Sequence, residues 1–220
     1  MPGDTCIQAQ SGRQIDRFLK RHPELAARYL DDPFWERRAI AVRYAPVAAI
    51  PALIHDPDEV VRRAVAYRIP VERLPELMQD PDHEVRITVA DRLPLERLEE
   101  LAQDSDYLVR VYVAKRLPEG RLFRMICDID ATVRKEVARR LPGPSLGLMA
   151  YDPDLEVRRI VVERMAPASL VVLLSDPEWL IRYLAAERAP REAIVKLRDD
   201  PDPEVRALVR ERLNTPDSSH

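Results

Sequence analysis

A repeat with a fixed period of 24 residues restricts this chain to very few folds. Aspartate recurs at positions 32, 56, 80, 104, 128, 152, 176 and 200, and arginine follows six residues after each aspartate. No insertion or deletion interrupts this register from residue 32 to residue 213. Repeats stacked in this way contact only their neighbours, so the chain lengthens along one axis instead of closing around one core. The repeat therefore predicts a solenoid that serves as a scaffold.

The first half of each repeat has the pattern of an amphipathic α-helix. If the aspartate is called position 0, position 2 is acidic in seven of the eight copies. Apolar residues follow at positions 5, 9 and 13, as in Val85, Val89 and Leu93. An acidic residue at position 2 suits a helix N-cap, and the spacing of four places the apolar side chains on one helix face. Proline at position 14 in six copies ends this helix after about ten residues.

The second half of the repeat holds a shorter apolar set at positions 18, 21 and 22, as in Leu74, Leu77 and Met78. The spacing is helical, but few residues remain before the next aspartate, so only a turn or two of 3₁₀-like helix fits. We therefore expect an all-α solenoid of about eight repeats, each an α-helix followed by a short 3₁₀-like helix, without β-strands.

The parts of the chain outside the repeat are short. We expect a leader over residues 1–13, N-terminal capping helices over 14–31, the repeats over 32–213 and a disordered tail over 214–220. Ile15, Phe18 and Leu19 have helical spacing, which indicates a degenerate first repeat. The last copy places Arg198 and Arg210 in columns that are otherwise mostly apolar, as expected where no further repeat covers the end.

Composition excludes several classes of function. The net charge of −3 comes from 35 basic and 38 acidic side chains mixed along the chain, which gives no general attraction to nucleic acid or to anionic membranes. No window approaches the roughly 18 apolar residues that cross a bilayer. The two cysteines give no disulfide framework, and no signal peptide is recognisable, so we expect a cytoplasmic protein. We also expect it to be a monomer.

The repeat motif closely resembles that of the leucine-rich repeat variant family. Residues 80–102 read Asp-Pro-Asp-x-x-Val-Arg-x-x-Val-Ala-x-Arg-Leu-Pro followed by Leu-x-x-Leu and hydrophobic residues, and the match covers about residues 25–213. Ordinary leucine-rich repeats have an asparagine or cysteine column, which this chain lacks. HEAT repeats need about 40 residues, which is longer than the period of 24 found here. The resemblance implies a right-handed superhelix of alternating α- and 3₁₀-helices. It also implies an association with nitrogen-fixation genes and a preceding cysteine-rich module that holds a four-iron four-sulfur cluster.

Only one cysteine of such a module stands in the leader, at Cys6. By resemblance the leader is a remnant of the module, and Cys6 is its single remaining cluster ligand. Because a cluster of this kind needs four ligands, we expect no cofactor in this chain as given, and a cluster only if upstream sequence supplies more cysteines. Cys127 has no thiol in the same column of other repeats, and we expect it to be a semi-buried filler.

The repeated charges allow two interpretations. Positions 0 and 6 form ladders that include Asp56, Asp80, Asp104 and Asp128 together with Arg62, Arg86, Arg110 and Arg134, and position 12 is arginine in seven copies. Positions 6 and 12 flank the apolar stripe, where each guanidinium can reach an aspartate of its own or the next repeat. We therefore expect structural ladders. The alternative is a surface that binds phosphate or nucleic acid, whose affinity would fall steeply with salt.

No group of residues has the spacing of a catalytic site. The four histidines share no metal-binding spacing, five glycines build no phosphate loop, and no serine or cysteine has a helically spaced histidine to activate it. We expect no enzyme. Instead, Tyr67, Ile87, Val111 and Tyr112 occupy helix positions that point away from the apolar stripe, and we expect them to form a patch for an unidentified protein partner. A non-enzymatic interaction scaffold is the first hypothesis, and an iron–sulfur electron-transfer or sensor protein is the alternative.

Overall fold

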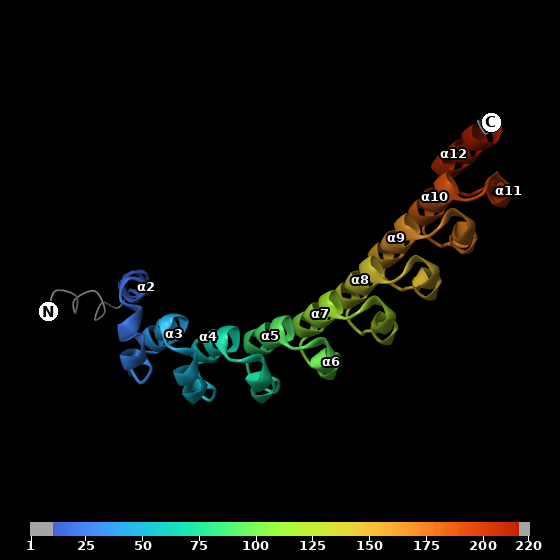
Figure 1. Ribbon diagram of the computed structural model, residues 1–220. Helices are drawn as coiled ribbons and strands as arrows, with labels where there is room; N and C mark the ends of the chain where they lie inside the picture. The colour runs from blue at the N-terminus through green and yellow to red at the C-terminus, as the bar shows by residue number, and fades with distance from the viewer. Residues whose placement is uncertain (1–10, 216–220) are drawn as a thin grey trace, which may run out of the picture. The chain divides into compact units, whose positions relative to one another are not determined.

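The computed structural model describes residues 11–215, and all regular elements in this range are helices. Contacts divide the chain into two compact units, the first ending at Arg116 and the second beginning at Leu117. The division falls within the repeat that begins at Asp104. In each unit the longer helices lie side by side in one layer, and the short helices form a second layer along one side of it (Figure 1). The predicted all-α repeat of long and short helices is confirmed.

The elements of the first unit follow the repeat in order. They are α2 (Gly12–Arg21), η1 (Pro23–Tyr29), α3 (Trp35–Tyr44), η2 (Val47–Leu53), α4 (Glu59–Arg68), η3 (Val71–Leu77), α5 (His83–Arg92), α6 (Leu95–Leu98), η4 (Glu99–Leu101) and α7 (Tyr107–Arg116). Each element named η is a 3₁₀-helix. In one repeat the short helix is mixed, because α6 supplies a single α-helical turn before η4.

The second unit contains the remaining elements. They are η5 (Glu119–Met125), α8 (Ala131–Arg140), η6 (Gly143–Met149), α9 (Leu155–Arg164), η7 (Pro167–Ser175), α10 (Trp179–Arg188), α11 (Arg191–Ile194), η8 (Val195–Leu197) and α12 (Pro203–Asn214). Neighbouring long helices pack on one another, and α8, α9 and α10 each pack on the short helix that precedes them.

The ends of the long helices have the predicted causes. Asp58 accepts a hydrogen bond from the Val60 N–H at 3.0 Å, which is an N-cap contact. At the other end Ile69, which precedes Pro70, is extended with ψ of 146° and stops the helix. The acidic residue at position 2 fails as a cap in one helix, since the Glu178 side chain makes no capping bond to α10. Aspartate has the shorter side chain that local capping favours.

The core of each unit lies between its two layers. The side chains at position 9 are buried in every repeat, those at position 5 in every repeat but the first, which has Arg37 there, and most of those at positions 13, 18 and 21 are also buried. Position 10 is mostly alanine and is buried in every repeat but the last, which lets neighbouring long helices approach closely. Arg198, near the end of the repeat that begins at Asp176, and Arg210, in the last repeat, are both exposed, as their charge predicts.

The ends of the described range differ slightly from the predicted boundaries. Helix α2 begins at Gly12, inside the expected leader, and α12 continues through Asn214, the first residue of the expected tail. Residues 1–10 of the leader, with Cys6, and residues 216–220 of the tail lie outside the described residues. Across residues 11–215 no helix has the length and apolar character needed to cross a membrane.

Candidate functional site

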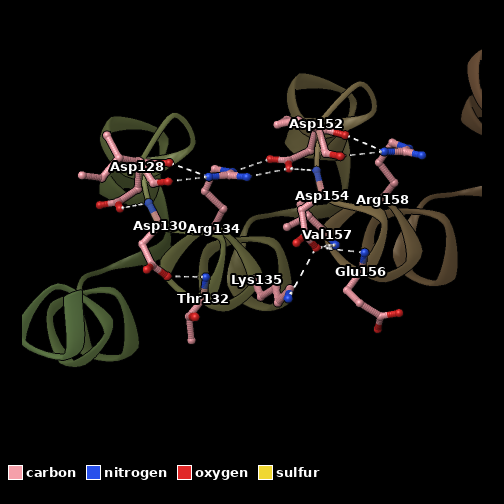
Figure 2. Close-up of polar contacts among 12 residues, drawn as sticks. Asp128, Asp130, Thr132, Arg134, Lys135, Asp152, Asp154, Glu156, Val157 and Arg158 are labelled. Atoms are coloured by element: carbon pink, nitrogen blue, oxygen red, sulfur yellow. Dashed lines mark hydrogen bonds and ion pairs between the residues drawn. The ribbon is translucent and has the colours of Figure 1, made fainter.

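The arginine at position 6 joins two successive repeats. Arg134 donates from Nε to Asp152 Oδ2 at 2.7 Å and from Nη2 to Asp152 Oδ1 at 3.0 Å (Figure 2). Its Nη1 donates to the backbone carbonyl of Asp128, in its own repeat, at 2.7 Å. The sequence left open which aspartate the guanidinium would reach. The structure shows that the carboxylate comes from the next repeat and that the preceding aspartate contributes its carbonyl oxygen.

The same two-pronged ion pair recurs through both units. Its members are Arg38 with Asp56, Arg62 with Asp80 and Arg86 with Asp104 in the first unit, and Arg134 with Asp152, Arg158 with Asp176 and Arg182 with Asp200 in the second, with Nε–Oδ2 distances of 2.7–2.8 Å. Arg110 Nη1 donates to the Asp104 carbonyl at 2.7 Å. Asp128 Oδ1 accepts from the Asp130 N–H at 2.8 Å.

The aspartate at position 0 also shapes the turn before the long helix. Asp152 Oδ1, besides accepting from Arg134, accepts from the Asp154 N–H at 2.9 Å (Figure 2). Asp154 in turn caps α9 through the N–H groups of Glu156 and Val157 at 2.9 and 3.1 Å. One carboxylate therefore holds an arginine of the previous repeat and fixes the start of its own helix, so ladder and helix caps form a single hydrogen-bonded chain.

Charge pairing stabilises the ionised form of both partners. The hydrogen bond that Arg134 donates to Asp152 raises the pKa of Arg134 above its ordinary value, and the hydrogen bond that Arg182 donates to Asp200 lowers the pKa of Asp200. Bidentate arginine–carboxylate pairs of this geometry are among the stronger polar contacts in proteins. The arginines of these pairs are thus already occupied by carboxylates of the chain.

The lowered pKa of Asp200 leads to a prediction about acid unfolding. Because the folded pKa lies below the unfolded value of about 3.9, this carboxylate contributes stability above about pH 4 that is lost as the pH falls through the folded pKa. Asp200→Asn should therefore lower stability at pH 7 and reduce the loss of stability between about pH 5 and pH 2, measured by urea unfolding.

The neighbouring exposed residue gives a matched control. Asp199→Asn removes the same charge one residue earlier, from an exposed side chain, and its stability should follow the wild-type pH dependence. If the Asp200→Asn and wild-type curves differed by a constant amount at every pH, the depressed pKa of Asp200 would be refuted.

The arginine at position 12 has a role that the sequence interpretation missed. Arg92 donates from Nη1 to the Ala66 carbonyl at 2.5 Å and from Nη2 to the Ile69 carbonyl at 3.0 Å. These carbonyls end the long helix of the previous repeat, where no backbone N–H remains to pair with them. Removal from solvent lowers the pKa of Arg92. The expectation that this column pairs with aspartate is therefore wrong for Arg92.

The same cap recurs in the other repeats of both units. It is made by Arg68, Arg92 and Arg116 in the first unit and by Arg164, Arg188 and Arg212 in the second. A signal was available in the sequence, since proline at position 14 forces the preceding residue out of helical geometry and leaves each long helix with unpaired carbonyls.

The predicted partner patch is only partly exposed. Tyr67 on α4 is exposed, Ile87 on α5 and Tyr112 on α7 are half-buried, and Val111 on α7 is 7% exposed. The assignment of Val111 to an exposed patch is wrong, because this side chain is buried although most others at position 7 reach the surface. Tyr112 also lies beneath a cation, with Lys115 Nζ 4.9 Å from its ring centre.

The described residues offer no cluster of metal ligands. No three or more histidine, cysteine, aspartate or glutamate side chains between residues 11 and 215 are placed to hold a metal ion. Cys127 is a free, exposed thiol, so its assignment as a semi-buried filler is wrong. The residue before the position-0 aspartate lies on the outer turn, where the core does not reach. The described part of the chain therefore does not fit an iron–sulfur cluster, and Cys6 lies outside it.

Together these features define a class: an all-α repeat protein whose recurrent charges join one repeat to the next. The profile of the leucine rich repeat variant family matches residues 35–58, 60–82, 83–106 and 131–154. A solved structure described as a leucine-rich repeat variant with a novel repetitive structural motif is 61% identical, with a TM-score of 0.87, and the match covers 94% of this chain and 88% of that one. The chain belongs to the leucine-rich repeat variant family.

Part of the chain is also similar to a curated protein from Rhodobacter capsulatus. An uncharacterized 27.7 kDa protein in the nifB 3' region of Rhodobacter capsulatus is 36% identical over 67 residues, which is 30% of this chain. The match spans 27% of the length of that relative.

Proposed function

We propose that this protein is a non-enzymatic, cytoplasmic scaffold that presents the outer face of its long helices to another protein. The observation that carries the proposal is that the repeated residues hold the repeats together, whereas the variable residues lie at the surface. The repeated arginines and aspartates bind one another and the backbone, so they build the stack. Positions 3, 4, 7, 8 and 11 of the long helices differ from repeat to repeat, and most of their side chains reach the surface. In stacked-repeat proteins such a surface is what partners bind.

Exposed aromatic and aliphatic side chains support the proposal. On the long helices they include Trp35, Tyr67, Tyr107 and Trp179. Contiguous exposed apolar patches often mark binding surfaces, and aromatic residues are enriched where proteins meet. Nucleic acid is the weaker candidate, because the arginines at positions 6 and 12 are directed to carboxylates and carbonyls of the chain. We further propose a nitrogen-fixation setting, which the name of the Rhodobacter capsulatus relative supports.

The proposal is tested by capture of a partner from native lysate. Immobilised chain should retain a specific protein, identified by mass spectrometry, and retention should survive nuclease treatment. Tyr67→Ala should weaken capture, whereas Asp91→Ala should not, because both residues occupy position 11 of neighbouring helices and only Tyr67 is apolar. Absence of any stoichiometric protein, or capture that nuclease abolishes, would contradict the proposal.

A further inference from the structure

Helix α10 has the most apolar outer face of the long helices in the second unit. Trp179, Leu180, Tyr183 and Leu184 lie at positions 3, 4, 7 and 8, opposite the buried Ile181 and Ala185 side of the helix. Trp179 is 41% exposed, and its ring meets that of Tyr183 edge-on with centroids 6.4 Å apart. We call these four residues the α10 patch.

The helices on either side extend the α10 patch. Helix α10 packs against α9 and α12. At position 8 these helices carry Ile160 and Leu208, both half-buried. At the same position α8 carries Glu136, so the apolar surface does not continue onto that helix.

Carboxylates surround this apolar surface. The exposed residues at positions 4 and 11 of α9, α10 and α12 include Glu156, Glu163, Glu187, Glu204 and Glu211. At positions 3, 4, 7, 8 and 11 of these three helices there is one basic residue, Arg159 on α9. It already pairs with Glu156 at 3.5 Å and with Glu163 at 3.2 Å. In the described part of the chain Glu187, Glu204 and Glu211 have no ion-pair partner. Their charge is available to a ligand.

We propose that the α10 patch binds a cationic amphipathic helix of a partner protein. Such a helix carries a stripe of bulky apolar side chains flanked by lysine or arginine. The apolar stripe would contact Trp179 and Leu184, and the flanking cations would meet the glutamates at positions 4 and 11, which we call the carboxylate rim. This inference rests on the proposed function and identifies one surface and one kind of partner. The chain itself supplies no such helix in the described range, because α2 is basic but buries Ile15 and Leu19 against its own unit.

The two tryptophans of the chain provide a direct test. Trp35 and Trp179 both stand at position 3 of a long helix and are 39% and 41% exposed. Trp35, however, lines a hollow in which Arg13 and Arg43 balance the charges of Asp16 and Glu36, so its surroundings have no excess of carboxylates. The Trp35→Phe chain therefore reports on the α10 patch through Trp179 alone. The Trp179→Phe chain reports on a matched site of different charge.

The probe is a peptide of leucine and lysine with helical periodicity, about 18 residues long and without aromatic residues. In the Trp35→Phe chain it should shift Trp179 emission to shorter wavelength and saturate. In the Trp179→Phe chain Trp35 emission should stay unchanged. A peptide of the same composition in scrambled order, and one with glutamate in place of lysine, should leave Trp179 emission unchanged.

Variants of the rim separate charge from folding. Replacing Glu187, Glu204 and Glu211 with glutamine keeps their shape and should weaken peptide binding by about tenfold at low salt, with a flatter dependence on salt. Leu184→Asp should abolish binding, provided circular dichroism shows an intact helical fold. Equal shifts at Trp35 and Trp179, no shift at Trp179, or binding unaffected by the three glutamines would overturn the inference.

The same variants distinguish failure of this inference from failure of the proposed function. If the triple glutamine chain captures the lysate partner as well as the wild type does, the α10 patch is not the binding surface, and the scaffold function stands on another face. If the wild type captures no protein at all, the scaffold function itself is wrong. Self-association of the wild type in analytical ultracentrifugation that the triple variant loses would assign the patch to a second copy, and would also overturn the inference.

Discussion

Arg134→Ala should lower the free energy of unfolding by about 3–5 kcal/mol, because it leaves the Asp152 carboxylate buried without its cation. The two side chains are 10% and 4% exposed, so water cannot replace the lost guanidinium. The substitution also removes the donor to the Asp128 carbonyl and so loosens the contact between two repeats. Urea unfolding followed by circular dichroism measures the loss.

A surface arginine on the same helix is the matched control. Arg139 is mostly exposed and lies 3.6 Å from Glu136, an ion pair of the kind that contributes little in water. Arg139→Ala should change stability by less than about 1 kcal/mol. Similar losses in the two variants would mean that the ladder is no more than a set of surface ion pairs.

Leu146→Ala should destabilise the chain by about 2–5 kcal/mol, as expected when a fully buried leucine is truncated. Leu146 lies on the short helix η6, is 0% exposed and belongs to the core between the two layers. Truncation leaves a cavity that the surrounding side chains of two repeats fill only in part. Thermal unfolding should show a clearly lower midpoint.

Leu148, two residues later on the same short helix, is 65% exposed and serves as the control. Leu148→Ala should stay within about 0.5 kcal/mol of the wild type, since exposed substitutions seldom cost more. Equal losses at Leu146 and Leu148 would contradict the two-layer packing, because only one of the two side chains faces the core.

The repeat made most of the fold predictable. A spacing of four apolar residues, an acidic N-cap and a proline stop act locally, so helix bounds such as Glu59–Arg68 follow closely from sequence. The carboxylate partner of Arg134 could not be predicted from the sequence, because the choice between Asp128 and Asp152 depends on how two repeats stack. The cap made by Arg92 was missed for the same reason, since it acts on the helix of the previous repeat.

The surface was less predictable than the stack. Helix position alone made Val111 appear exposed, yet its side chain is buried. The repeat pattern did not single out Trp179 and Tyr183. Their significance emerges only once α9 and α12 are known to lie on either side of α10, with Glu204 and Glu211 among the residues of the rim.

The central claim is that the recurrent charges hold successive repeats together, and a double-mutant cycle on Arg134 and Asp152 tests it most directly. The cycle compares Arg134→Ala, Asp152→Ala and the double variant by urea unfolding at pH 7. If the pair acts as a unit, the double variant should lose little more stability than either single variant, with a coupling energy of about 2 kcal/mol or more. Losses that add to within about 0.5 kcal/mol would show that the two residues act independently and would contradict the claim.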